Sequence, residues 1–226
     1  MKEIDKRQED GEGDRTFYTD EQLITVGMDL FMTGSDTTST ALEFALLFML
    51  RFPHVQAKVQ EEIDSVIGRD RLPNIADKIS MPYTEATTWE IMRCTCLVPI
   101  AIRTALRDGL QINGVTLKKE TMVGINLVSI HYSEELWEDP QSFRPERFLN
   151  EKMELVNLHK IIPFGFGKRA CIGDWMAKST FFTFFVTCLQ NFTFEKVPWL
   201  PEPSTKTYSG IAQYPMQFSA LVKERF

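Results

Sequence analysis

The chain has 226 residues, of which 43% are hydrophobic and 25% charged, a composition typical of a globular protein that can bury a core. Its formal net charge of −6 argues against a nucleic-acid-binding surface, which needs an excess of basic residues. The four cysteines (94, 96, 171 and 188) form neither a CxxC pair nor a secreted-type framework, which favours a reducing compartment.

Residues 1–18 are charged along most of their length, and we expect a flexible lead-in there rather than a signal peptide or an anchor. The longest apolar run, ALEFALLFML, contains Glu43 and is too short to cross a bilayer. The sequence therefore predicts no membrane span within this chain.

A long helix is expected over about 19–51, opened by a capping box of Thr19 and Gln22. Within it, TGSDTTST is a run of small and polar residues that weakens and bends a helix and offers hydroxyls and a carboxylate to a neighbour. The alternative is a helix end, with Ser35 or Asp36 capping a new helix. The residues alone leave the two interpretations even.

Two further helices are expected over 53–67, stopped by Gly68, and from Pro82 to before Pro99. In the third helix Glu90 and Arg93 are three residues apart. Such pairs are common on solvated helix faces, where they stabilise by about 0.2–0.5 kcal/mol, so the pair alone is a weak signal.

Beyond the third helix the periodicity changes. The expected elements are strands over 100–107 and 110–117 with a hairpin at Asn113-Gly114, a strand leading into a helix over 121–130, a last helix over about 172–190 and strand pairs in the tail. Residues 139–170 are mostly irregular, and loops that long are usually functional. On these patterns alone the chain is one α+β domain.

The irregular segment contains FRPERF, which places Arg144 and Arg147 around a proline turn between two aromatic residues. One interpretation is a surface turn. The other is that a planar guanidinium forks onto a carboxylate such as Glu90 and locks the loop to the third helix.

The stretch PFGFGKRACIG surrounds Cys171 with three kinds of residue. Its glycines let the backbone approach a flat group, and its two phenylalanines are expected to form apolar walls (Gly165, Gly167 and Gly173; Phe164 and Phe166). Lys168 and Arg169 are cations, which favour a thiolate. The amino end of the following helix points at the sulfur. A nucleophile would need a histidine base, but the three histidines lie in no supporting motif. An axial thiolate ligand of an iron porphyrin accounts for all these neighbours.

At this point the chain resembles the cytochrome P450 family, in the style of its animal microsomal members. Every fixed place of the family's haem-binding signature is filled here, by Phe164, Gly167, Arg169, Cys171 and Gly173. Three other family motifs occur in the family's order: the oxygen-activating stretch (Gly34, Asp36, Thr37, Thr38), Glu-x-x-Arg (Glu90, Arg93) and Pro-Glu-Arg-Phe (145–148).

The resemblance implies a mostly α fold with small β-sheets, namely the carboxy-terminal half of the P450 fold: a long central helix, a helix pair, a haem-binding loop and the helix after it. It implies haem b with the Cys171 thiolate as axial iron ligand, and a thiolate favours cleavage of the O–O bond. Phe164 would shield the sulfur and Arg169 would pair with a propionate. Asp36 and Thr37 would relay protons to dioxygen.

The sequence departs from the family pattern at two places near the cofactor. Thr33 stands where the family usually has Ala or Gly. The family's Pro-His-Arg is replaced by VPIAIRTALRD, so Arg103 is the candidate for a second propionate contact and Arg107 is the alternative. Glu90, Arg93 and Arg147 would form a charged lock with a structural role.

By this resemblance the chain is a haem-thiolate monooxygenase that acts on a small lipophilic substrate and receives electrons from NADPH-cytochrome P450 reductase. The full-length protein would lie on the cytoplasmic face of the endoplasmic reticulum membrane. Family members are roughly twice this size, so we expect residues 19–226 to be a partial P450 domain that binds haem weakly alone. The alternative is a truncated, non-catalytic haem-binding or inert fragment.

Overall fold

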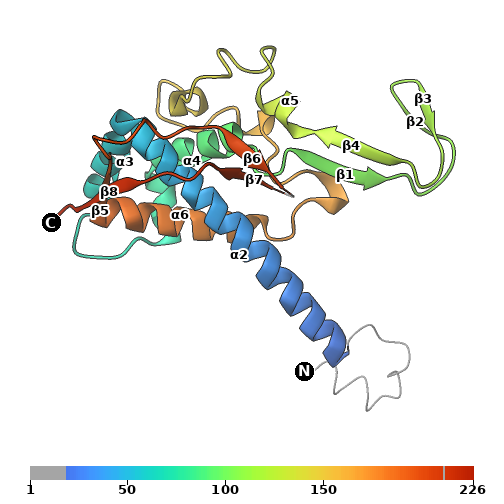
Figure 1. Cartoon of the computed structure of the whole chain (residues 1–226), viewed down its shortest axis with the longest axis horizontal. Helices are drawn as coiled ribbons and strands as arrows, with labels where there is room; N and C mark the ends of the chain where they lie inside the picture. Colours follow the sequence, from blue (N-terminus) through green and yellow to red (C-terminus); the bar gives the residue numbers. More distant parts are fainter. Residues whose placement is uncertain (1–18, 211) are drawn as a thin grey trace.

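The computed structural model describes residues 19–210 and 212–226, so the lead-in expected over 1–18 lies outside the described residues. The described part is mostly helical, as expected, with small two-stranded sheets (Figure 1). The longer helices are α2 (Asp20–Arg51), α3 (Pro53–Val66), α4 (Pro82–Thr95) and α6 (Asp174–Asn191). Short helices are α5 (Leu127–His131) and the 3-10 turns η2 (Ile75–Ser80), η3 (Pro145–Phe148), η4 (Leu158–Lys160) and η5 (Gly167–Arg169).

Helix α2 begins where the sequence predicted. Thr19 Oγ1 accepts a hydrogen bond from the Gln22 backbone N–H at 3.1 Å, the half of the capping box in which the N-cap side chain acts. The helix continues unbroken through TGSDTTST, so the interpretation of that stretch as a helix end is wrong. The hydroxyls of Thr33, Thr37 and Ser39 donate back to carbonyls four residues earlier, which lets polar side chains remain inside a helix.

The carboxy-terminal half of α2 supplies the core. Phe44 to Leu50 are buried with almost no interruption, and they pack with apolar residues of α3, α4 and α6 in one cluster. In α3 the residues Val55, Val59 and Ile63 face this cluster and are each at most 1% exposed. Gly68 then takes a positive φ of 74°, and its N–H closes the helix on the Ile63 carbonyl.

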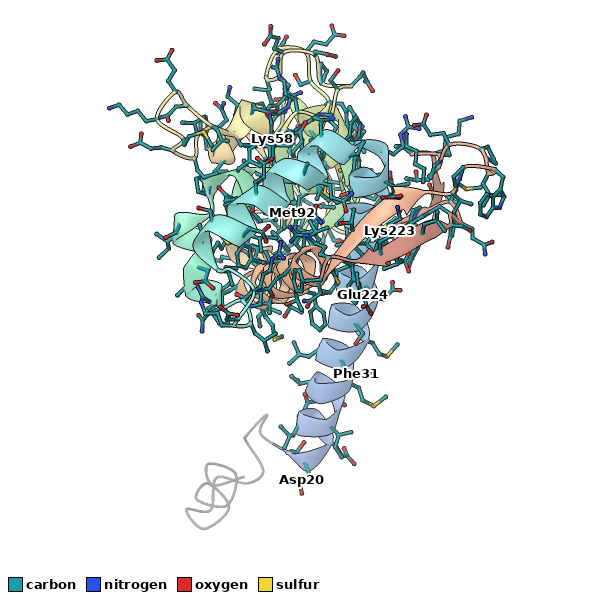
Figure 2. All side chains as sticks on the ribbon, turned by 90° about the vertical axis from the view of Figure 1, so that its left-hand side faces the viewer. Asp20, Phe31, Lys58, Met92, Lys223 and Glu224 are labelled. Atoms are coloured by element: carbon teal, nitrogen blue, oxygen red, sulfur yellow. The ribbon has the colours of Figure 1, made fainter. Side chains whose placement is uncertain are left out.

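The amino-terminal half of α2 extends beyond the other elements, and Figure 2 shows Phe31 on this part of the helix with Asp20 at its far end. Large apolar side chains are exposed along it, including Phe31 at 75% and Met32 at 66%. In the described residues no helix has an apolar stretch long enough to cross a membrane.

The strands form antiparallel pairs of distant or adjacent segments. β1 (Ile100–Thr104) pairs with β4 (Met122–Asn126), and β2 (Leu110–Ile112) with β3 (Val115–Leu117). The predicted turn is confirmed, since Asn113 and Gly114 both have positive φ, at 47° and 80°. The expected 100–107 strand is shorter and pairs with the strand of the 121–130 segment, which then becomes α5 as predicted.

The tail forms two pairs. β5 (Phe192–Lys196) pairs with β8 (Ala220–Glu224), as the tail pattern predicted, and a further hairpin joins β6 (Thr207–Ser209) to β7 (Gln213–Pro215). Figure 1 shows this hairpin lying across α2. The segment 139–170 is irregular, as expected, with only 3-10 turns and one bridge between Leu149 and Leu155.

Candidate functional site

A cavity of about 290 Å³ lies where α2, α4, β1, α5, α6 and the Cys171 loop meet. Most of the side chains that line it are apolar, and the polar exceptions are three threonines, two arginines and one thiol. The lining residues are Thr37, Thr38, Ala41, Ile91, Met92, Thr95, Leu97, Val98, Ala101, Arg103, Leu127, Pro163, Phe164, Gly165, Arg169, Cys171, Ala177 and Phe181.

Cys171 brings a free thiol to this cavity. It is exposed and forms no disulfide, unlike a structural cysteine. Its backbone N–H donates to the Phe164 carbonyl at 2.9 Å, so the loop folds back on itself. Gly165 and Gly167 bend that loop with φ of 71° and 73°, which a residue with a Cβ adopts only at a cost.

The start of helix α6 lies close to the sulfur. Gly173 is the N-cap of α6, and a Cβ added there would lie 3.8 Å from Cys171 Sγ. The amino end of α6, which carries the partial positive charge of the helix, therefore lies beside Cys171. The predicted relation between Cys171 and the following helix is therefore confirmed, with the helix beginning two residues later than expected.

The two phenylalanines of the loop do not play the same part. Phe164 lines the cavity, as expected, whereas Phe166 is 61% exposed and does not line it. The expectation that both form apolar walls is wrong for Phe166. The backbone there is extended (φ −150°, ψ 165°), and side chains two residues apart lie on different faces because Gly165 turns the chain between them.

Two guanidinium groups line the cavity, those of Arg103 and Arg169. Arg103 Nη2 donates to the Arg169 carbonyl at 3.1 Å, which joins β1 to the Cys171 loop. Lys168 and Arg107 are exposed and do not line the cavity. Of the two candidates for a second carboxylate contact, the structure therefore brings Arg103, and not Arg107, to the cavity.

The polar stretch of α2 contributes Thr37 and Thr38 to the cavity, but Asp36 does not line it. Asp36 Oδ2 instead accepts a hydrogen bond from the Tyr214 hydroxyl at 2.7 Å, and the Tyr214 ring stacks on Tyr208. The hydrogen bond to the carboxylate raises the pKa of Tyr214.

Glu90 and Arg93 form a buried ion pair, so the interpretation as a solvated helix face is wrong. Both side chains are 0% exposed, and Arg93 Nε and Nη2 donate to the two Glu90 carboxylate oxygens at 2.7 and 2.8 Å. Arg93 also donates to the carbonyls of His131 and Pro140. Burial opposes the charge of Arg93, but the bonds to Glu90 outweigh it, and its pKa is raised.

The FRPERF segment docks on this pair. Arg147 Nε donates to Glu90 Oε1 at 2.9 Å, and its other nitrogens donate to carbonyls of the loop. The Arg144 backbone N–H also donates to Glu90, whereas the Arg144 side chain turns to Glu138 at the surface. The predicted lock of loop to helix is confirmed for Arg147, and the surface-turn interpretation is wrong.

Sequence patterns did not single out the part of α4 that faces the cavity. Ile91, Met92 and Thr95 line the cavity, while Glu90 and Arg93 on the same helix turn to the ion pairs. The spacing i, i+1, i+4 is typical of one helix face and is the signal that could have found them.

The polar groups at the cavity are one thiol, two guanidinium groups and three threonine hydroxyls. In residues 19–210 and 212–226, no group of three or more His, Cys, Asp or Glu could hold a metal ion. Apolar walls with two guanidinium groups suit a flat apolar ring that carries carboxylates.

The family model for "Cytochrome P450" matches residues 2–221 of this chain. Among curated proteins, cytochrome P450 2U1 of Mus musculus is 40% identical over 222 residues, which cover 96% of this chain and 41% of the relative. Cytochrome P450 2D4 of Rattus norvegicus is 38% identical over 208 residues, covering 92% of this chain and 42% of the relative. The chain thus spans about two-fifths of the length of these curated relatives.

A solved zebrafish cytochrome P450 with abiraterone superimposes on the chain with a TM-score of 0.85 at 31% identity. The superposition covers 92% of this chain and 48% of that structure. The described residues therefore have part of the fold of that protein.

Proposed function

This chain belongs to the cytochrome P450 family, and we propose that it is the catalytic carboxy-terminal part of a haem-thiolate monooxygenase. Such an enzyme inserts one oxygen atom of O₂ into an organic substrate and reduces the other to water. The observation that carries the proposal is the free Cys171 thiol in an apolar cavity that also contains Thr37 and two guanidinium groups.

The residues present suit haem b. Cys171 would hold the haem iron through its thiolate, and Phe164 would keep water from the sulfur. Arg103 and Arg169 would pair with the propionates, since guanidinium groups recognise carboxylates. Gly165 supports the fit through its backbone, because its φ of 71° turns the loop beside Arg103 in a way that a residue with a Cβ adopts only at a cost. We propose supporting roles for Gly167 and Gly173, which shape the loop around the sulfur.

When bound, haem supplies the iron at which dioxygen is reduced and split. The protein's task is then to hold the sulfur and to deliver protons. Thr37 lines the cavity, and its hydroxyl donates to the Thr33 carbonyl at 2.7 Å, which leaves the hydroxyl oxygen able to accept a hydrogen bond. Asp36, the preceding residue, is exposed, where a carboxylate exchanges protons with water. We propose that Asp36 and Thr37 are the two ends of a proton route.

The second candidate is a non-catalytic haem-binding or inert fragment. The exposed apolar side chains along the first half of α2, such as Phe31, favour it, because in the described residues nothing covers them. We propose residues 19–226 as one partial P450 domain in either case.

Partners and location follow from the family. We propose a small lipophilic substrate, electrons from NADPH-cytochrome P450 reductase, and a full-length protein on the cytoplasmic face of the endoplasmic reticulum membrane. The zebrafish structure contains abiraterone, an organic small molecule, which supports the ligand class. The negative net charge of the chain argues against a nucleic-acid partner.

The test is the spectrum of the reduced, CO-treated chain after haem is added. We expect a weak long-wavelength Soret band of a thiolate complex in the wild type, because the chain alone should bind haem weakly. The band should be lost in Cys171→Ala and retained in Cys188→Ala, a change at a half-buried cysteine of α6. A band retained in Cys171→Ala would overturn the assignment of Cys171 as the thiolate ligand. A thiolate band without product formation, when the reductase and NADPH are supplied, would select the non-catalytic alternative.

A further inference from the structure

His131, at the end of α5, is a buried histidine that no motif of the sequence singled out. Its side chain is 0% exposed. Nε2 accepts a hydrogen bond from the Ile162 backbone N–H at 3.2 Å, and Nδ1 is buried without a hydrogen-bond partner in the described residues. Burying an imidazole of which only one nitrogen forms a hydrogen bond costs free energy. The one hydrogen bond that the ring does form is therefore a candidate for a specific role.

The contacts fix the charge state of the ring. A nitrogen that accepts an N–H bond carries no proton, so the ring proton lies on Nδ1 and the imidazole is neutral. Burial and the nearby Arg93 guanidinium lower the pKa of His131 to about 4, in agreement with this assignment. His131 is therefore a hydrogen-bond acceptor at neutral pH.

On one side, His131 is attached to the buried ion pairs. Arg93 Nη1 donates to the His131 carbonyl at 2.8 Å, and the same guanidinium is paired with Glu90. Trp137 Nε1 donates to the neighbouring Ile130 carbonyl, which holds the end of α5 from another direction. The backbone of His131 is thus held by groups that are themselves fixed.

On the other side, a series of backbone hydrogen bonds leads from His131 to the thiol. Ile162 donates to His131, and its carbonyl accepts from the Gly165 N–H at 3.0 Å. Within that turn lies Phe164, whose carbonyl accepts from the Cys171 N–H at 2.9 Å. The chain from Ile162 to Cys171 contains only the short turn η5, so its position depends on these bonds and on the one from Arg103 Nη2 to the Arg169 carbonyl.

We propose that His131 is a positioning residue for the Cys171 loop: its Nε2 holds Ile162 and thereby fixes the loop relative to the Glu90–Arg93 pair. The functional meaning rests on the proposed role of Cys171 as haem ligand, while the positioning itself does not. Ile161 packs in a small cluster with Trp137 and Phe148, so packing anchors the start of the loop. The hydrogen bond from the Ile162 N–H to His131 Nε2 then fixes the orientation of the backbone there.

The experiment compares the exchange rate of the Ile162 amide in the full chain with that in two variants. His131→Leu keeps an apolar side chain of similar size and removes the acceptor. His131→Gln places its amide oxygen near the position of Nε2. We expect exchange on the order of 3- to 10-fold faster in His131→Leu, the effect of losing one neutral hydrogen bond, and a rate near that of the wild type in His131→Gln.

His159→Leu is the control, because His159 is an exposed histidine three positions before Ile162. It should leave the Ile162 rate unchanged. Equal exchange in the wild type and His131→Leu would overturn the proposal, and so would equal acceleration in His131→Leu and His131→Gln, which would mean that only packing matters.

A second readout links the loop to the cofactor. In the haem-loaded chain we expect His131→Leu to lower the share of the thiolate-type Soret band and His131→Gln to restore it. An unchanged band in His131→Leu would overturn the link to the ligand. These outcomes are distinct from failure of the proposed function, which is read from Cys171→Ala.

Discussion

The Tyr214 hydroxyl donates to Asp36 Oδ2 at 2.7 Å across 178 residues of sequence, and so fastens the β6–β7 hairpin to helix α2. The hairpin is held at a second point, where the Gln213 N–H donates to the Leu97 carbonyl at 2.8 Å. Since Leu97 lines the cavity and Asp36 precedes the cavity residue Thr37, the hairpin connects two of the cavity's edges.

The Asp36 carboxylate should control the titration of Tyr214. Its negative charge and its hydrogen bond raise the pKa of the phenol, so Asp36→Asn should lower the pKa of Tyr214 toward its ordinary value. The measurement is the difference in phenolate absorbance against pH between the wild type and Asp36→Asn. Tyr214→Phe, which removes this titration step, identifies the signal. Identical curves for the wild type and Asp36→Asn would show that the two side chains are apart in solution.

Removing the charge of Glu90 should destabilise the chain strongly. Two guanidinium groups, those of Arg93 and Arg147, pair with this fully buried carboxylate, and Glu90→Gln leaves them without a counter-charge. We expect a loss of about 3–5 kcal/mol in the free energy of unfolding, measured by urea denaturation.

The matched control for that prediction is Glu195→Gln. Glu195 pairs with Lys223 at 2.7 Å, but both side chains are about half exposed or more. Exposed pairs contribute about 0–1 kcal/mol, so this variant should unfold near the wild-type midpoint. Comparable losses for the two Glu→Gln variants would contradict the structural role assigned to Glu90.

The fold was predictable where its signals are local. The helix starts at Pro53 and Pro82 and the Asn113-Gly114 turn follow from neighbouring residues whose conformational preferences agree. The Cys171 loop was found for the same reason, because its glycines, aromatic residues and cations are consecutive. Even there the alternation of Phe164 and Phe166 depended on how Gly165 turns the backbone, which the residue types do not specify.

The site was not predictable where it depends on contacts between distant segments. Nothing near His131 or Tyr214 in the sequence indicates that they bond Ile162 and Asp36. The spacing of Glu90 and Arg93 is shared by solvated and buried pairs, and burial is decided by the FRPERF loop that covers them. Such contacts are set by tertiary packing, to which local patterns are blind.

His131 should make stability depend on pH between about 4 and 6.5. Its pKa is lowered to about 4 in the folded chain, whereas an unfolded histidine titrates near 6.5. As the pH falls through this window, His131 becomes protonated in the unfolded chain but stays neutral in the folded chain. The free energy of unfolding therefore falls, by about 3 kcal/mol at most, and levels off below pH 4. The charge of Arg93, whose guanidinium donates to the His131 carbonyl, adds to the effect of burial in keeping the folded-state pKa of His131 low.

The measurement is the free energy of unfolding of the wild type minus that of His131→Gln, at pH 7.5 and at pH 5. Carboxylates titrate alike in both proteins, so the subtraction isolates His131. We expect the wild type to lose stability relative to His131→Gln on acidification. A difference that does not change with pH would mean that the imidazole is not held neutral.

The backbone of the Cys171 loop should tolerate a methyl group at Gly173 but not at Gly167. Gly167 has a φ of 73° and open space around its Cβ position, whereas Gly173 has a φ of −88° and would place a Cβ in ordinary contact, 3.8 Å from Cys171 Sγ. Gly167→Ala should therefore cost about 1–2 kcal/mol through backbone strain alone, and Gly173→Ala should cost less. Urea unfolding of the two variants measures the difference. Because both changes add one methyl group to the same loop, equal costs would mean that crowding, and not the positive φ, governs the loop.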